Sequence, residues 1–149
     1  MTTPEFSRAI IEELYSEALV LADEARGVFD LRARETDGPD QDEVRIALSI
    51  EGLKTTARVM HVLAWLLNRR AFLSGELSEY QLRKSGGLPA DRPSDDKQMA
   101  KLLPETRELI RDTERLYART ARLDVVEEPT LESPVSRMHG RLNQAFATA

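Results

Sequence analysis

The stretch TTARVMHVLAWLLNRRAFLSGEL, residues 55–77, decides the fold of this 149-residue chain. Its apolar run from Val59 to Leu67 is interrupted by one histidine, so no single helical face can hold all of its apolar residues. A membrane-spanning helix needs about 20 mostly apolar residues. This run is roughly half as long and is closed by Arg69 and Arg70. We therefore expect a buried helix that other parts of the protein cover on more than one side.

This helix is expected to span about residues 42–73 and to carry two apolar seams side by side. The first seam has the alternating spacing of four and three that is typical of a heptad repeat: Ile46, Ile50, Leu53, Ala57, Met60, Ala64, Leu67 and Ala71. The second seam comprises Leu48, Val59, Val62, Leu66 and Leu73. A helix that is apolar on all sides is normally buried, so we expect both seams to be covered.

The composition is typical of an all-α protein. Charged residues make up 32% and aromatic residues only 5% of the chain, and no window shows sustained period-two alternation between turn residues. Thr3 and Pro4 favour the start of a first helix, whose apolar residues recur at three and four positions as far as Phe29. Together with the central helix and a third helix after residue 94, this first helix predicts an antiparallel three-helix bundle with long helices over residues 1–126.

The third helix is expected to begin near Ser94 or at Pro104 and to carry leucines inward. Before it lies a connection of about twenty residues after Ser74, rich in glycine and proline, in which residues 76–84 favour a short helical turn. After it, residues 127–149 contain two prolines and one glycine and are expected to form a flexible C-terminal tail.

Charge and residue content argue against several classes of function. A net charge of −5 gives no overall attraction to nucleic acid, and the absence of cysteine excludes disulfides and thiolate metal sites. Neither His61 nor His139 has the Glu-x-x-His partner of a metal site in a helical bundle. Glu12, Glu13 and Glu17 lie mainly opposite the apolar stripe and are interpreted as a solvated face. We expect no catalytic, cofactor-binding or metal site, and no enzymatic activity.

The N-terminal residues lack the pattern of a secretory signal, namely a basic region, an apolar block and a small-residue cleavage site. The apolar run of the central helix is also too short to span a bilayer. We therefore expect a cytoplasmic protein that does not associate with membranes.

Two blocks of the sequence resemble a known family. AWLLNRRAFLSGELS, residues 64–78, and RLYARTARLD, residues 115–124, are similar to the RcdA family of alphaproteobacteria, the regulators of CtrA degradation, also known as DUF1465. The likeness covers the second and third helices well, the first helix by general pattern, and the tail hardly at all.

The resemblance implies a three-helix bundle that forms a homodimer and has no enzymatic activity. It further implies an adaptor that helps deliver cell-cycle regulators to the ClpXP protease, so the partners expected are a second copy, a ClpX-type protease complex and regulator clients. The alternative is a helical dimeric scaffold that tethers other proteins with no protease involved. An enzyme or ligand-binding bundle is disfavoured because the seams contain no convergent polar groups.

Two surfaces are assigned on this basis. The dimer interface is placed on the second helix, at Val59, Val62, Trp65, Leu66, Arg69 and Leu73. Partner binding is placed in the connection and in the tail, at Glu76, Leu77, Tyr80, Met138, Leu142 and Phe146. The three tail residues are spaced by four, which predicts one or two amphipathic turns that would fold onto a groove of a partner.

Overall fold

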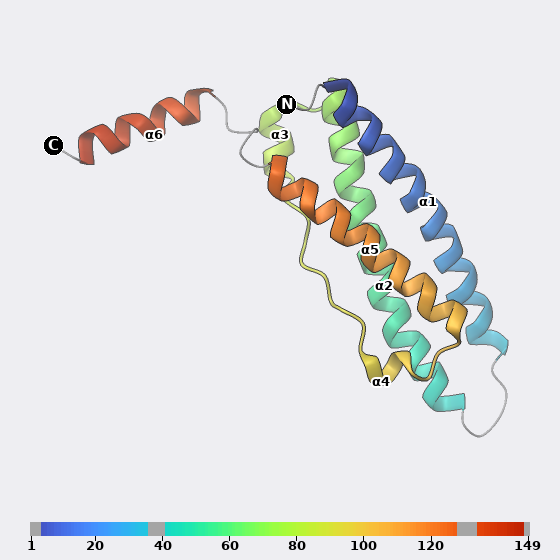
Figure 1. Ribbon diagram of the computed structural model, residues 1–149. Helices are drawn as coiled ribbons and strands as arrows, with labels where there is room; N and C mark the ends of the chain where they lie inside the picture. Colours follow the sequence, from blue (N-terminus) through green and yellow to red (C-terminus); the bar gives the residue numbers. More distant parts are fainter. Residues whose placement is uncertain (1–3, 36–40, 128–133, 148–149) are drawn as a thin grey trace.

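The computed structural model describes residues 4–35, 41–127 and 134–147, with side chains described for residues 7–30, 41–124 and 138–147. These residues form six helices and no strand (Figure 1). The helices are α1 (Pro4–Glu35), α2 (Gln41–Leu73), α3 (Glu79–Lys84), α4 (Asp96–Met99), α5 (Pro104–Glu127) and α6 (Pro134–Ala147). The prediction of an all-α helical bundle is confirmed, and α1, α2 and α5 are its three long helices.

The directions of the long helices differ in part from the expected antiparallel arrangement. Helix α1 runs opposite to α2, but α5 runs in the same direction as α2 (Figure 1). Two contacts fix this direction, because Arg58 of α2 meets Thr113 of α5 and Trp65, further along α2, meets Asp124, further along α5. The physical reason is the connection between α2 and α5, which returns along the length of the bundle before α5 begins.

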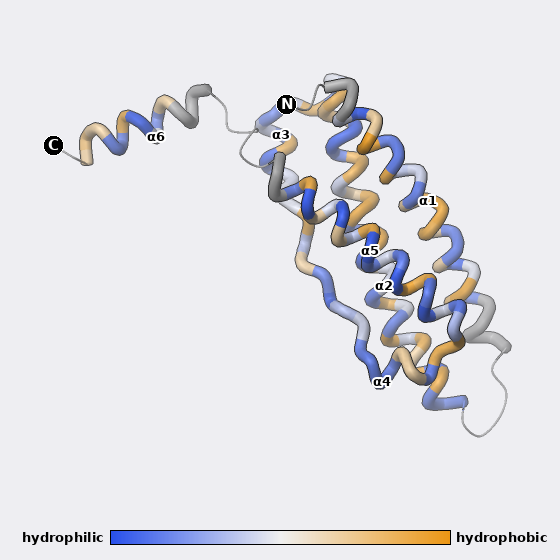
Figure 2. The backbone as a smooth tube through the Cα atoms, in the orientation of Figure 1, coloured by the Kyte–Doolittle hydropathy of each residue, from blue (hydrophilic) through white to orange (hydrophobic). Residues whose placement is uncertain are grey.

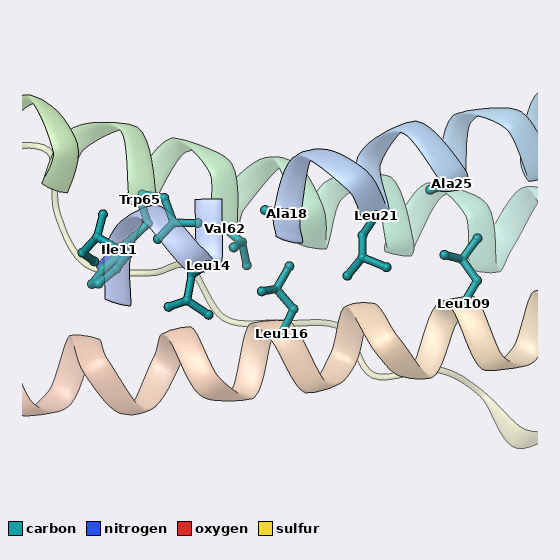
Figure 3. Packing of buried hydrophobic residues seen from close by; sticks show 10 residues of the cluster. Ile11, Leu14, Ala18, Leu21, Ala25, Val62, Trp65, Leu109 and Leu116 are labelled. Atoms are coloured by element: carbon teal, nitrogen blue, oxygen red, sulfur yellow. The ribbon is translucent and has the colours of Figure 1, made fainter. Parts of the chain in front are cut away.

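The main core lies where the three long helices meet (Figure 3). Leucines of α5, among them Leu109 and Leu116, point toward the alanine-rich face of α1 and the buried face of α2 (Figure 3). Small residues allow close approach here, since a Cβ at Gly52 of α2 would lie 2.9 Å from the ring of Phe29 in α1. A smaller second cluster, which includes Met99 and Leu102, closes the end of the bundle near α4.

Helix α2 ends in the glycine cap that the sequence predicts. Gly75 has a φ of +83°, and the amide of Glu76 donates to the carbonyl of Ala71 at 2.8 Å. This pairing satisfies a carbonyl at the helix end that has no partner within the helix. Short helix α3 then begins at a capping box, in which Ser78 and Gln81 each accept a hydrogen bond from the backbone amide of the other.

Helix α6 lies apart from the bundle (Figure 1). Apolar and polar residues alternate along it (Figure 2), and every side chain described in it, from residue 138 to 147, is exposed. The expected one or two amphipathic turns are thus a 14-residue helix. The flexibility predicted for the tail stays a prediction.

Candidate interaction surfaces

One face of α2 carries charged side chains into the interior of the bundle. Glu51, Arg58 and Arg69 are all buried, and Arg58 is only 1% exposed. Glu51 and Arg58 are seven residues apart and therefore share a helical face. Opposite this face, α5 presents three fully buried threonines in the same heptad position: Thr106, Thr113 and Thr120. A buried polar seam thus runs between α2 and α5.

Arg58 forms the centre of this seam. Its Nε donates to both carboxylate oxygens of Asp91, at 3.0 and 2.9 Å. One terminal nitrogen donates to Thr113 Oγ1 at 3.1 Å and the other to the carbonyl oxygen of Arg92 at 2.9 Å. The buried guanidinium is therefore paired with a charge and hydrogen-bonded on each nitrogen, as a buried cation requires.

Further polar contacts extend the seam in both directions. Toward the start of α2, Glu51 Oε1 accepts from the amide of Asp95 and from Lys54 Nζ, both at 3.1 Å. Toward its end, Trp65 Nε1 donates to Asp124 Oδ1 at 2.9 Å, and the amide of Leu88 donates to Asp124 Oδ2 at 3.1 Å. The partners of α2 thus come both from α5 and from the connection that precedes it.

These contacts tie down residues 86–95, which we name the strap. In addition, Tyr117 of α5 donates from its hydroxyl to the carbonyl of Pro89 at 2.5 Å, and Ser94 donates to Glu114 at 3.0 Å. Burial raises the pKa of Tyr117 above its ordinary value, and the negative charge of Asp91 raises it further. The strap is therefore an ordered part of the fold, a point that the sequence left open.

The exposed and buried sides of α2 differ from the sequence-based assignment. We name the seam of Ile46, Ile50, Leu53, Ala57, Met60, Ala64, Leu67 and Ala71 the outer seam, because all of these residues except partly buried Ala71 are exposed. Leu53 is 74% exposed and Met60 is 58% exposed. The expectation that both seams are buried is thus wrong for the outer seam.

The dimer residues assigned from sequence lie on the opposite, inner side of α2. Leu73 packs partly buried against the core, and the other five are buried within the single chain: Val59, Val62, Trp65, Leu66 and Arg69. A second copy could reach these five only by unfolding the bundle, so we correct the assignment. The physical reason is that α1 and α5 of the same chain already cover the second seam of α2.

A cleft lies at the end of the outer seam, between the start of α1 and the end of α2. Its lining includes Arg8, Glu12, Leu67, Arg70 and Glu76. Arg70 donates to Glu12 Oε1 at 2.6 Å, and this hydrogen bond raises the pKa of Arg70 further above its high ordinary value. The guanidinium also lies 4.2 Å from the ring centroid of Tyr15. Both contacts come from α1, so the guanidinium of Arg70 is oriented toward α1 at the end of α2.

The residues assigned to partner binding fall into two separate groups. Glu76, Leu77 and Tyr80 lie in the turn after α2 and in α3, where Tyr80 is 71% exposed. The tail residues share one exposed face of α6: Met138, Leu142 and Phe146. The two groups are separate, because α3 and the turn before it lie against the bundle and α6 lies apart from it (Figure 1).

Sequence reasoning missed Arg58, Asp91 and Asp124. One signal for Arg58 was present, because Glu51 and Arg58 lie seven residues apart in α2 and the three threonines of α5 have the same spacing. The contribution of the strap could not be found in this way, since its polar residues have no periodicity.

Among the residues with described positions, no three His, Cys, Asp or Glu side chains come close enough together to hold a metal ion. Of the helices in the described ranges, none has the length and apolarity that crossing a membrane would require.

Comparison with known protein families gives a match over nearly the whole chain. Residues 2–146 match the model of a family described as "Protein of unknown function (DUF1465)". No curated protein and no solved structure shows significant similarity to the chain.

Proposed function

The chain belongs to the DUF1465 family, and from this premise we propose that it is a non-enzymatic, homodimeric adaptor that helps deliver cell-cycle regulators to the ClpXP protease in the cytoplasm. The family match extends over nearly the whole chain, and the sequence resemblance to the RcdA regulators supplies the adaptor role. An adaptor needs surfaces for at least two partners, held on a stable frame.

The observation that carries the proposal is the apolar face of α6. Met138 is 63%, Leu142 50% and Phe146 78% exposed, and the helix lies apart from the bundle (Figure 1). Residues spaced by four on a helix are the usual anchors for binding in an apolar groove of a partner protein. The face is too small to form a core of its own, which supports a role in binding.

The bundle supports the proposal in a second way. The strap and the polar seam hold α2 and α5 in one arrangement, so the turn with Glu76 and Leu77 and the exposed ring of Tyr80 in α3 are presented from a fixed frame. A rigid frame lowers the entropy that must be lost when a partner binds. We assign Glu76, Leu77 and Tyr80 to a second contact surface.

The test is a degradation assay with purified ClpX, ClpP and a regulator substrate, with and without this protein. The triple variant Met138→Ser, Leu142→Ser and Phe146→Ser should lose the stimulation of degradation. A control, Leu103→Ser at an exposed position outside α2 and α6, should keep it. If the wild-type protein neither stimulates degradation nor binds ClpX or the substrate, the adaptor proposal is wrong.

The alternative is a dimeric scaffold that tethers other proteins without a protease. The same exposed face of α6 would serve it. Binding of a regulator through α6 with no effect on its degradation would favour the scaffold.

A further inference from the structure

The outer seam alternates large and small residues. Four positions spaced by seven carry large side chains: Ile46, Leu53, Met60 and Leu67. The positions between and after them carry Ile50 and then three alanines, Ala57, Ala64 and Ala71. All four large residues are between 47% and 74% exposed, so no packing among the described residues explains the pattern.

This alternation decides how two such seams can pack. In a parallel pair in register, each residue faces its own copy, so layers of two alanines would alternate with layers of two large side chains. Close packing disfavours the voids and crowding that would result. In an antiparallel pair each alanine can face a large residue of the other helix, so that three of the four distinct layers reach a similar volume and only Ile50 faces another large residue, Leu67.

We propose that a second copy of the chain covers the outer seam, with the two α2 helices antiparallel and a two-fold axis crossing between Ala57 and Met60. Ala57 then packs against Met60 of the second copy, and Ala64 packs against its Leu53. Ala71 packs against the second copy's Ile46. A two-fold axis repeats each contact in the opposite sense, so this register uses all eight residues of the seam.

The charges at the ends of α2 agree with this orientation. The first turn carries Asp42 and Glu43, and the last turn carries Arg70. The antiparallel pair brings the acidic start of one helix beside the basic end of the other, where the opposite helix dipoles also attract. A parallel pair would place like charges side by side at both ends.

The size of the seam is sufficient for a stable interface. Residues 46–71 of a helix extend about 38 Å at about 1.5 Å per residue. A contact strip about 20 Å wide along this length would reach the roughly 800 Å² per partner that is typical of specific complexes. Helix α1 packs beside α2, and its Glu12 and Tyr15 contact Arg70 near the end of the seam, so α1 of each copy can supply part of this width.

This inference rests on the homodimer of the proposed function but on no protease or client. The geometry of the helix pair and the adaptor role can therefore be refuted independently of each other. A loss of adaptor activity would leave the geometry of the helix pair untouched, and a different dimer geometry would leave the degradation assay unaffected.

The first experiment exchanges the volumes of one facing pair. Leu53→Ala and Ala64→Leu should each weaken dimerisation about tenfold or more in sedimentation equilibrium, because each breaks the match of large against small. The double variant should return toward the wild-type dissociation constant, because the alanine introduced at position 53 then faces the leucine introduced at position 64 of the second copy. Leu103→Ala, at an exposed position outside α2, is the control and should have no effect. Stronger dimerisation of Ala64→Leu alone would indicate that the leucine introduced at position 64 faces its own copy, as in a parallel pair, and would overturn the proposal.

The second experiment measures the orientation directly. The chain has no cysteine, so a spin label can be placed at one position by Ser49→Cys or Thr56→Cys, both exposed beside the seam. In the proposed register the two copies of residue 49 are about 28 Å apart along the helix axis and those of residue 56 about 8 Å. The distance between the two spin labels, measured by electron paramagnetic resonance, should therefore be clearly longer for position 49 than for position 56. Equal short distances at both positions, or a monomer at all concentrations, would refute the antiparallel pair.

Discussion

Arg58 shows how one residue sets the position of a long connection. Its guanidinium is buried, and two of its partners, Asp91 and the carbonyl of Arg92, lie in the strap. A buried ion pair adds little net stability compared with apolar residues of the same volume, but the loss of one partner is costly. The pair therefore favours the observed position of the strap, in which Asp91 and the carbonyl of Arg92 satisfy the arginine.

Asp91→Ala should lower the free energy of unfolding by about 3 kcal/mol, since it leaves a buried cation without its charge partner. Urea unfolding followed by circular dichroism measures this. The control is Asp112→Ala, because Asp112 pairs with Arg115 at the exposed surface and should contribute no more than about 0.5 kcal/mol. Equal effects of the two substitutions would show that Arg58 does not depend on Asp91.

Tyr117 gives the strap a dependence on pH. Burial raises the pKa of this phenol in the folded protein, so the neutral form stabilises the fold in full below the unfolded-state pKa of about 10. This stabilisation is lost as the pH rises through the folded-state pKa. The stability advantage of the wild type over Tyr117→Phe should thus shrink above about pH 10 in urea unfolding at a series of pH values. A wild-type advantage over Tyr117→Phe that stays constant across the pH series would contradict the prediction.

At the scale of the helix, α2 has two apolar sides with different roles. Substitution of two adjacent leucines, one on each side, tests this difference. Leu66 is fully buried in the main core, whereas Leu67 is 47% exposed on the outer seam. Leu66→Ala should lower the free energy of unfolding by about 2 to 5 kcal/mol. Leu67→Ala should cost less than about 1 kcal/mol at concentrations where the chain is a monomer. Similar losses for both would mean that the two sides of α2 are assigned wrongly.

Helix α6 differs from the long helices because it lies apart from the bundle (Figure 1). A 14-residue helix with a central glycine is marginal in water. Gly140→Ala should stabilise it by about 1 kcal/mol, since no atom lies within 4 Å of the added Cβ. The Cα chemical shifts of residues 134–147 should then move toward helical values. Gly27→Ala in α1, also without a close neighbour, should leave these shifts unchanged.

The long helices could be predicted from sequence because local signals define them. Each of these signals depends only on residues that are close in the sequence: the proline at the start of α1, the glycine cap after α2 and the heptad spacing. Which seam of α2 faces inward could not be predicted in this way, since both seams are apolar. The choice depends on where α5 packs, and that depends on the strap, whose contacts to Arg58 and Asp124 join residues 33 and 36 positions apart.

At the scale of the whole molecule, the strap explains the direction of α5. Because the connection returns along the bundle, α5 starts beside the start of α2 and runs parallel to it (Figure 1). The threonines of α5 then face the charged side of α2 in matching heptads, and the leucines of α5 face α1. This arrangement covers two sides of α2 and leaves the outer seam as its third, uncovered side.

If a second copy covers that side, folding and association are linked, and stability should depend on protein concentration. Any partner that binds only the folded state raises apparent stability by mass action. The urea midpoint of the wild type should therefore rise with concentration across the range in which sedimentation shows dimers. Leu53→Glu places a charge in the middle of the outer seam, so its dimer should dissociate and its midpoint should not change with concentration. The fold of this variant should persist, because Leu53 is 74% exposed in the single chain. Leu103→Glu, on an exposed leucine outside the seam, should keep the dependence of the wild type. A wild-type midpoint that stays constant while sedimentation detects dimers would show that the second copy adds nothing to the stability of the bundle, and the outer seam would then lie outside the dimer contact.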